Sequence, residues 1–269
     1  MFTIDIAGVV LGFFDVDEIA FSYLRQKYKA QTVFESSDNC HLYLSIKCVD
    51  YKKNMRFSCM KVGMKVENNE YILYLRCDGL LFGQARINLL GKLCHIELMS
   101  FDEETLDLAI SIIWRIVSVI HGKILLHASA IMLDGQAVLF CGHSGAGKST
   151  ILNLLQQESL TDEMACLALD RNFVPVYHEI PWRNFDHGNI TIPLRKIYIL
   201  SKAEDISCRN VSTEIAEALL PKFFYFNLWI DNGRDVAKCV LSAILKQVSV
   251  QILEFNMIES EKIINLIND

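Results

Sequence analysis

Residues Gly142 to Ser149 read GHSGAGKS and match the phosphate-binding pattern G-x-x-x-x-G-K-[ST] in full. Glycines let a backbone wrap closely around phosphates, so that successive amide N–H groups point inward and the following helix presents its positive end to the same charge. A lysine in this position reaches the β- and γ-phosphates, and the next hydroxyl ligates Mg²⁺. The apolar run QAVLFC precedes the pattern and STILNLL follows it. The sequence therefore predicts a nucleotide-phosphate site formed by Gly142, His143, Ser144, Gly145, Ala146, Gly147, Lys148, Ser149 and Thr150.

Two common classes of phosphate-loop protein do not fit the rest of the chain. A regulatory GTPase carries a base-reading N-K-x-D after a late strand, whereas the nearest match here, SKAE, has Ser201 for Asn and Glu204 for Asp. We interpret SKAE, including Lys202, as an exposed junction between a strand and a loop. A transporter-type ATPase carries an LSGGQ-like signature and an apolar strand that ends in Asp-Glu, and neither sequence occurs.

The residues around the phosphate pattern resemble a third class. HASA, which begins at His127, then GHSGAGKST, then LTDE, which ends at Glu163, resemble the C-terminal kinase domain of the HPr kinase/phosphorylase family and its shorter relatives. The resemblance covers roughly residues 123 to 186. It implies a fold related to phosphoenolpyruvate carboxykinase, in which the phosphate loop extends from a mixed sheet. It also implies transfer of the γ-phosphoryl group of ATP to a serine hydroxyl, sometimes with the reverse phosphorolysis.

The resemblance assigns roles to individual residues. Asp162 matches the acidic residue that takes the proton from the attacking hydroxyl, and Glu163 matches a Mg²⁺ ligand, direct or through water. His127 matches a histidine close to the phosphates, although a histidine on an apolar strand is also typical of a protein core. Arg183, in the loop YHEIPWRNFDHGN, could neutralise charge on the transferred phosphate, with a surface loop as the alternative. We expect His143 to be tolerated in the loop without a catalytic role.

The chain also departs from true HPr kinases. It lacks the Ile/Arg/Gly-rich strand and loop that follow the acidic pair, and the second acidic residue is Glu163 rather than Asp. These departures argue against HPr as the substrate. The shorter relatives include kinases that act on ribosomally made precursor peptides, and a β-rich N-terminal region could hold an extended peptide by strand addition.

The composition excludes several partners and environments. The chain has 269 residues, 52% of them hydrophobic, and a net charge of −6 with a pI near 5.7. No Lys/Arg cluster exceeds the small group Lys52, Lys53 and Arg56, so we expect no nucleic-acid partner. Nine cysteines without a CxxC pair or a signal peptide favour a reducing cytoplasm, with buried rather than metal-bound thiols at Cys40, Cys48, Cys59, Cys77 and Cys94. The apolar segment 106–122 contains Arg115, so it predicts a buried helix and no membrane span.

The order of predicted elements indicates an α/β (α+β) protein with two parts. Residues 1–100 contain a helix over about 17–29 and short runs rich in β-branched and aromatic residues, which predict a mostly antiparallel β region for recognition of a substrate or peptide. Residues 101–269 should form the mixed-sheet phosphate-loop domain. Within it, Asp134-Gly135 between apolar runs predicts a hairpin ahead of the loop, a helix should start at Lys148, and the last third should be mainly helical.

The leading hypothesis is an ATP- and Mg²⁺-dependent kinase for a serine hydroxyl of a peptide or small protein. One alternative is a nucleotide-binding regulatory module with little or no transfer activity, and another is a kinase for a small-molecule hydroxyl. ATP rather than GTP follows from the resemblance alone. Hexamers occur in the resembling family, so a homo-oligomer is left open.

Overall fold

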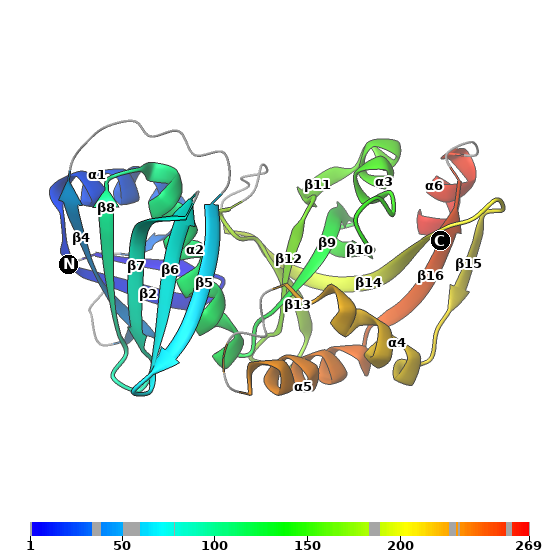
Figure 1. Ribbon diagram of the computed structural model, residues 1–269. Helices are drawn as coiled ribbons and strands as arrows, with labels where there is room; N and C mark the ends of the chain where they lie inside the picture. The colour runs from blue at the N-terminus through cyan, green and yellow to red at the C-terminus, as the bar shows by residue number, and fades with distance from the viewer. Residues whose placement is uncertain are drawn as a thin grey trace. The chain divides into compact units, whose positions relative to one another are not determined.

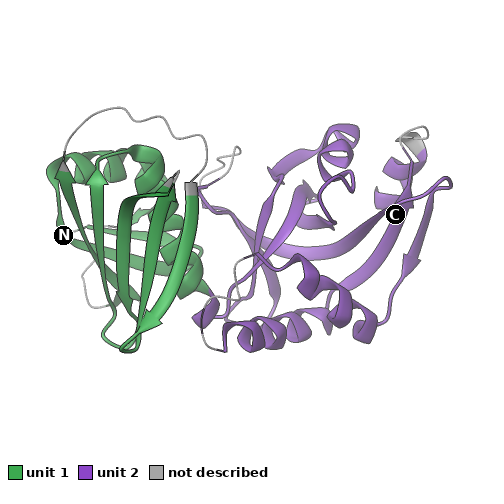
Figure 2. Cartoon of the chain, viewed as in Figure 1, with its two compact units in different colours: residues 1–118 green, residues 119–269 purple. Residues whose placement is uncertain are grey.

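The computed structural model of the protein describes residues 2–33, 39–50, 60–77, 79–182, 189–225, 230, 232–256 and 260–268. It divides into two compact units, residues 1–118 and residues 119–269, each with its own eight-stranded sheet (Figure 2). Both units combine helices with a sheet of mixed strand direction, which gives a mixed α/β protein. Arg183, Cys59 and the basic group Lys52, Lys53 and Arg56 lie outside the described residues.

The sheet of unit 1 has the strand order β3-β1-β2-β4-β8-β7-β6-β5. Figure 1 labels the strands from β4 to β5 in this order. Its strands are β1 Phe2–Ile6, β2 Val9–Val16, β3 Thr32–Val33, β4 Leu42–Asp50, β5 Met60–Glu67, β6 Glu70–Cys77, β7 Leu80–Asn88 and β8 Leu93–Ser100. Most pairs are antiparallel, as predicted, but β2, β4 and β8 lie parallel to one another. Exposed and buried side chains alternate along β8, which places one face of this strand in the core.

Two helices belong to unit 1: α1 Glu18–Lys27 and α2 Glu103–Ile120. Asp102 caps α2, because its Oδ2 accepts hydrogen bonds from the Thr105 backbone N–H at 2.8 Å and the Thr105 hydroxyl at 2.7 Å. Trp114 is 0% exposed and donates from Nε1 to the Ile6 carbonyl at 3.1 Å. The boundary between the units therefore lies near residue 118 rather than residue 100, since most of α2 packs with the first sheet.

The segment that imitates a membrane span is the buried helix α2. Arg115 near its middle is itself buried, and Gly122, with φ +70°, follows its end. In the part of the chain that the structure describes, no helix is both long enough and apolar enough to cross a bilayer. Of the thiols predicted to be buried, Cys40 and Cys94 are buried and Cys48 is half-buried.

The sheet of unit 2 consists of β9 Ile124–Leu133, β10 Gln136–Cys141, β11 Glu158–Thr161, β12 Met164–Leu169, β13 Pro175–His178, β14 Thr191–Lys202, β15 Ser207–Asn210 and β16 Ser249–Phe255. Strand β10 pairs antiparallel with β9 and parallel with β14, and β14 pairs parallel with β16. The pairings of β9, β10, β14, β13 and β12 return to β9 and so close a ring of five strands. The sheet is mixed, as expected.

Helices cover both faces of this second sheet. The helices are α3 Lys148–Leu155, α4 Thr213–Leu219, α5 Gly233–Leu245 and α6 Ser260–Asn268. One core cluster joins the sheet to α4 and α5 through residues such as Ala216 and Leu241. The other joins it to α3 and α6 through residues such as Ile151 and Ile263. The expectation of a mainly helical last third was wrong in one respect, because β15 and the largely buried β16 complete the sheet there.

The hairpin ahead of the phosphate loop forms as predicted. Asp134 and Gly135 both adopt positive φ, 51° and 74°, which suits a tight two-residue turn between β9 and β10. Arg195 Nη1 lies 3.0 Å from Asp134 Oδ2 beside this turn. Strand β10 then leads directly into the phosphate loop, and α3 begins at Lys148, as predicted.

Candidate functional site

The predicted phosphate loop, Gly142 to Ser149, occupies the turn between β10 and the start of α3. Gly145 and Gly147 have φ of 78° and 102°, conformations that side chains with a Cβ rarely adopt. A Cβ added at Gly142 would lie 2.7 Å from the Cβ of Ala146, so the loop closes tightly only with glycine there. Gly147 serves as N-cap of α3 without any side chain, which leaves the first N–H groups of the helix open to a ligand.

Lys148 turns back into this loop. The residue is only 8% exposed, and its Nζ donates to the Gly142 carbonyl at 2.8 Å and the His143 carbonyl at 3.3 Å. Burial lowers the pKa of Lys148, while Cys141 and Glu163 act in the opposite direction. The loop therefore holds an amine at its centre, within reach of any phosphate bound to the surrounding N–H groups.

The acidic pair lies between β11 and β12, and the backbone fixes its position. Thr161 Oγ1 accepts hydrogen bonds from the backbone N–H of Glu163 at 3.4 Å and of Met164 at 3.3 Å. The Glu163 carbonyl accepts from the N–H of Ala128 on β9 at 3.2 Å. Both carboxylate-bearing residues are half-buried. Strand β11, which the sequence did not predict, thus carries the chain from α3 to the pair.

His127 lies on β9 directly opposite Met164, the residue that follows the acidic pair. Its ring stacks with that of Tyr225 at a centroid distance of 6.1 Å. Tyr225 in turn donates from its hydroxyl to Glu163 Oε1 at 3.3 Å and from its backbone N–H to the Leu125 carbonyl at 2.7 Å. Sequence reasoning missed Tyr225, because no motif distinguishes it within the aromatic run KFFYF.

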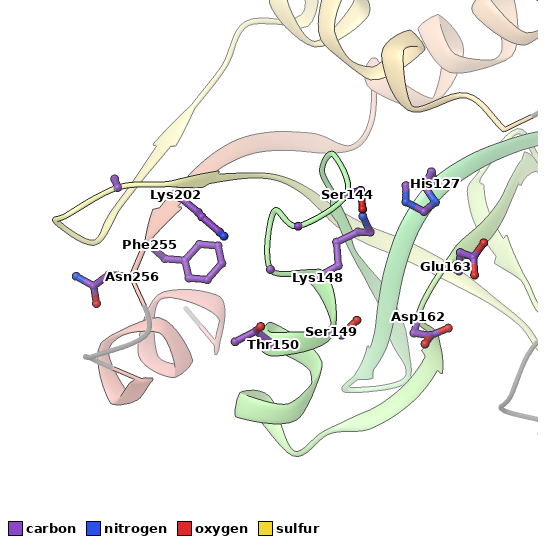
Figure 3. Close-up of a pocket in the computed structure, with 13 residues that line it drawn as sticks. His127, Ser144, Lys148, Ser149, Thr150, Asp162, Glu163, Lys202, Phe255 and Asn256 are labelled. Atoms are coloured by element: carbon purple, nitrogen blue, oxygen red, sulfur yellow. The ribbon is translucent and has the colours of Figure 1, made fainter.

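One cavity of about 590 Å³ brings these residues together, as the close-up in Figure 3 shows. Its lining consists of His127, Ser144, Gly145, Gly147, Lys148, Ser149, Thr150, Asp162, Glu163, Lys202, Ala203, Phe255 and Asn256. The predicted loop, acidic pair and His127 therefore share one site. The predicted loop residues Gly142, His143 and Ala146 do not line it, and the exposed His143 lies 5.2 Å from the ring of Phe223.

Four lining residues were not predicted. Lys202 and Ala203 belong to the SKAE sequence, which we interpreted as an exposed strand-to-loop junction. The interpretation is correct for the backbone and for the exposure of Lys202, but the junction also forms a wall of the cavity. Phe255 and Asn256 come from the end of β16, a strand that the sequence analysis placed in a helical region.

The arrangement fits a bound nucleotide and a magnesium ion. A Cβ at Gly142 would meet Ala146 and a Cβ at Gly147 would meet Phe255, so the loop has no room for side chains at these two positions. Lys148 and Ser149 at the start of α3 both line the cavity. Within the described residues, no three His, Cys, Asp or Glu side chains cluster as a metal site. Ser149 and Glu163 line the cavity and could supply oxygen ligands to magnesium, which usually takes few protein ligands beside phosphate oxygens and water.

A second polar group, which does not line the cavity, consists of the buried His178 on β13, the half-buried Lys123 just before β9 and the exposed Thr191 at the start of β14. His178 is 9% exposed, with Nε2 at 3.3 Å from Lys123 Nζ and Nδ1 at 2.8 Å from Thr191 Oγ1. Burial, and then the positive charge of Lys123, lower the pKa of His178 to about 4. The neutral ring is therefore the stable form inside the fold at neutral pH.

No protein-family model matches the chain, and no curated protein matches it in sequence. Among solved structures, the HPr(Ser) kinase/phosphatase from Coxiella burnetii matches with 15% identity and a TM-score of 0.30, over 54% of this chain and 91% of that chain. Similarity at this level does not transfer an activity to this chain.

Proposed function

We propose that the protein is an ATP- and Mg²⁺-dependent kinase that transfers the γ-phosphoryl group to a serine hydroxyl of a peptide or small protein. One observation carries the proposal: Lys148 of the phosphate loop and the carboxylates of Asp162 and Glu163 line the same cavity. A group that holds phosphate thus faces groups that can accept a proton. Phosphoryl transfer needs this positioning and electrostatic complementarity more than covalent help from the protein.

Asp162 is the proposed proton acceptor. Glu163 already accepts a hydrogen bond from the Tyr225 hydroxyl, whereas no hydrogen bond to the Asp162 carboxylate was found among the described residues. The acceptor oxygen would form a bond to the γ-phosphorus as the bond from that phosphorus to the β–γ bridging oxygen breaks. The hydroxyl proton would pass to Asp162, and ADP would leave with the bridging oxygen.

The remaining residues would position and neutralise the reacting groups. Lys148 would bind the β- and γ-phosphate oxygens, exchanging its loop carbonyl partners for them. Ser149 and Glu163 would hold magnesium, which supplies charge neutralisation on the phosphates. His127 would stand beside the γ-phosphate, oriented by its stacking on Tyr225.

A phosphoenolpyruvate carboxykinase-like fold is part of the proposal. The mixed sheet, with the β9–β10 hairpin immediately ahead of the loop, supports it. We propose that unit 1 binds the acceptor peptide. Its strand β5 is at one end of the sheet order and pairs with β6, so its other edge has no strand partner among the described residues. Such an edge can add a strand from an extended peptide.

The test is transfer of labelled γ-phosphate from Mg-ATP to components of a soluble extract from the source of the protein. Lys148→Ala should abolish binding and transfer. Asp162→Asn should retain MgADP binding while transfer falls by about 10²- to 10⁴-fold, the usual contribution of a positioned base. Acid-stable label on a peptide or protein is the expected product. Phosphate release alone, or nucleotide binding without any turnover, would instead favour a regulatory nucleotide-binding module.

A further inference from the structure

The carboxyl ends of three parallel strands meet at the phosphate loop. Strands β10, β14 and β16 are neighbours in the sheet, with Cys141 paired to Ile199 and Lys202 paired to Phe255. Ligands of sheets with parallel strands bind beyond the carboxyl ends of those strands. The phosphate loop follows β10, so the ends of β14 and β16 supply the next surface along the same edge.

Hydrogen bonds and packing hold the surface formed by the ends of β14 and β16 in place. The backbone N–H of Ala203 donates to the Phe255 carbonyl at 3.1 Å, which ties the two strand ends together. The Asn256 side-chain amide donates to the Glu204 carbonyl. Phe255 is only 2% exposed, and its ring lies so close to Gly147 that a Cβ there would come 2.5 Å from the ring. Phe255 therefore forms an apolar floor under the loop rather than a mobile flap.

The carboxylates of Asp162 and Glu163, which we propose to act in catalysis, lie on the side of the phosphate loop opposite to the ends of β14 and β16. In Figure 3, Asp162, Glu163 and His127 stand on one side of Lys148, and Lys202, Phe255 and Asn256 stand on the other. If the γ-phosphate faces Asp162, the rest of the nucleotide extends from Lys148 in the opposite direction. The α-phosphate and the nucleoside then lie over the ends of β14 and β16.

Charge supports this direction. Two carboxylates line the cavity, so a second lysine beside Lys148 would offset their repulsion of a nucleotide with several negative charges. Lys202 points toward the phosphate loop in Figure 3, and no carboxylate pairs with it within the residues that the structure describes. Its ammonium group is thus available to an anionic ligand at the wall that the carboxylates do not occupy.

We propose that Lys202 binds the α-phosphate of the nucleotide, and that the edge formed by Lys202, Ala203, Phe255 and Asn256 is the nucleoside subsite. This inference rests on nucleotide binding as proposed above but not on the identity of the phosphoryl acceptor. It orients the nucleotide in the cavity, with the nucleoside at the ends of β14 and β16 and the γ-phosphate and the acceptor near Asp162.

The test measures dissociation constants by isothermal titration calorimetry for MgATP, MgADP and magnesium pyrophosphate. Pyrophosphate fills the two phosphate positions beside Lys148 and lacks both the α-phosphate and the nucleoside. Lys202→Met should weaken MgATP and MgADP equally, by about tenfold, the effect of one hydrogen bond to a charged group. Pyrophosphate affinity should change less than about twofold by the same reasoning, because it makes no contact with Lys202.

Two controls accompany this variant. Lys196→Met removes a lysine from the same strand, where its Nζ lies 5.5 Å from the Tyr198 ring centroid and outside the cavity lining, and should bind all three ligands as the wild type does. Lys202→Arg retains the charge and should restore most of the nucleotide affinity. An unchanged MgATP affinity in Lys202→Met would overturn the inference, as would an equal loss for pyrophosphate.

Failure of the two proposals can be told apart. Nucleotide binding that depends on Lys202, without transfer to any acceptor, would support the subsite and contradict the kinase. Transfer by a Lys202→Met variant with unaltered nucleotide affinity would support the kinase and overturn the subsite. A wild-type protein that binds neither nucleotide would overturn both.

Discussion

Each unit of this protein places three parallel strands side by side and starts a helix near their carboxyl ends. In unit 1 the strands are β2, β4 and β8, and aspartates follow two of them. Asp17 accepts from the Cys48 backbone N–H at 2.5 Å, and Asp102 caps α2. In unit 2 the strands are β10, β14 and β16, and a glycine stands at the N-cap of α3.

The difference shows what separates a structural strand end from a candidate binding site. At the end of β8, Asp102 satisfies a free N–H group of α2 from within the chain, whereas the Asp17 side chain makes no capping hydrogen bond to α1 and accepts from the Cys48 N–H of β4. A glycine leaves such helix N–H groups open and lets the backbone turn tightly around an outside anion. The sheets have equal numbers of strands, so sheet size does not decide function.

The largest expected effect is a loss of folding stability at low pH, and it comes from a histidine in unit 2. His178 in unit 2 has its pKa lowered to about 4, so the folded state resists the proton that the unfolded chain takes up below about pH 6.5. This contribution to stability is fully present above pH 6.5 and is lost as the pH falls toward 4. Between pH 7 and 4.5 the free energy of unfolding should fall by about 2–3 kcal/mol from this residue.

Urea unfolding at the two pH values measures this loss. His178→Gln has no titrating ring, so the decrease between pH 7 and 4.5 should be smaller in the variant by about the same 2–3 kcal/mol. The variant will start from a lower stability at pH 7, because it loses the contact with Thr191. Equal decreases in wild type and variant would show that the buried ring does not govern the acid response.

The next effect tests the glycine at the start of α3. Gly147→Ala places a Cβ 2.5 Å from the Phe255 ring at a φ of 102°, and such strain costs about 1–3 kcal/mol. We expect MgADP affinity to fall by about tenfold or more. The matched control is Gly63→Ala on β5 of unit 1, where nothing lies within 4 Å of the added Cβ and the affinity should not change. Calorimetric titration of both variants distinguishes a strained loop from a general loss of glycine.

The smallest effect is expected from removal of the aspartate that caps α2 in unit 1. Asp102→Ala deprives α2 of two hydrogen bonds and should lower the free energy of unfolding by about 1 kcal/mol. Nucleotide affinity should be unchanged, since Asp102 does not line the cavity. Thermal unfolding and MgADP titration of the same sample check both statements. A marked loss of affinity would mean that the two strand-end edges are not independent.

The local parts of the site were predictable from sequence. The Asp134-Gly135 hairpin, the glycine loop and the start of α3 are determined by residues close together in the chain, where turn chemistry and periodicity act. The closeness of Asp162 and Glu163 to the loop followed from the resemblance and agrees with the shared cavity. Their catalytic roles stay predictions, as does that of Arg183, which lies outside the described residues.

The nonlocal parts were not predictable in the same way. In β16 the alternation of apolar and polar residues extends over only a few positions, and the strand lies between two helices in the sequence. Its structure therefore depends on its pairing with β14, which leaves no local signal in the sequence. Lys202 was correctly placed at the end of a strand, but its approach to the phosphate loop depends on the parallel register of β10 with β14. Tyr225 reaches Glu163 by the same kind of long-range packing.

The contact between Phe255 and Gly147 has a consequence for the order of biosynthesis and folding. Contacts between residues far apart in a chain cannot form until the later residue has left the ribosome, and domains fold largely as units during synthesis. The sheet of unit 1 and the β9–β10 hairpin can therefore assemble while the loop still lacks its floor. The nucleotide binding proposed above would therefore lack the Phe255 floor until β16 has been synthesised.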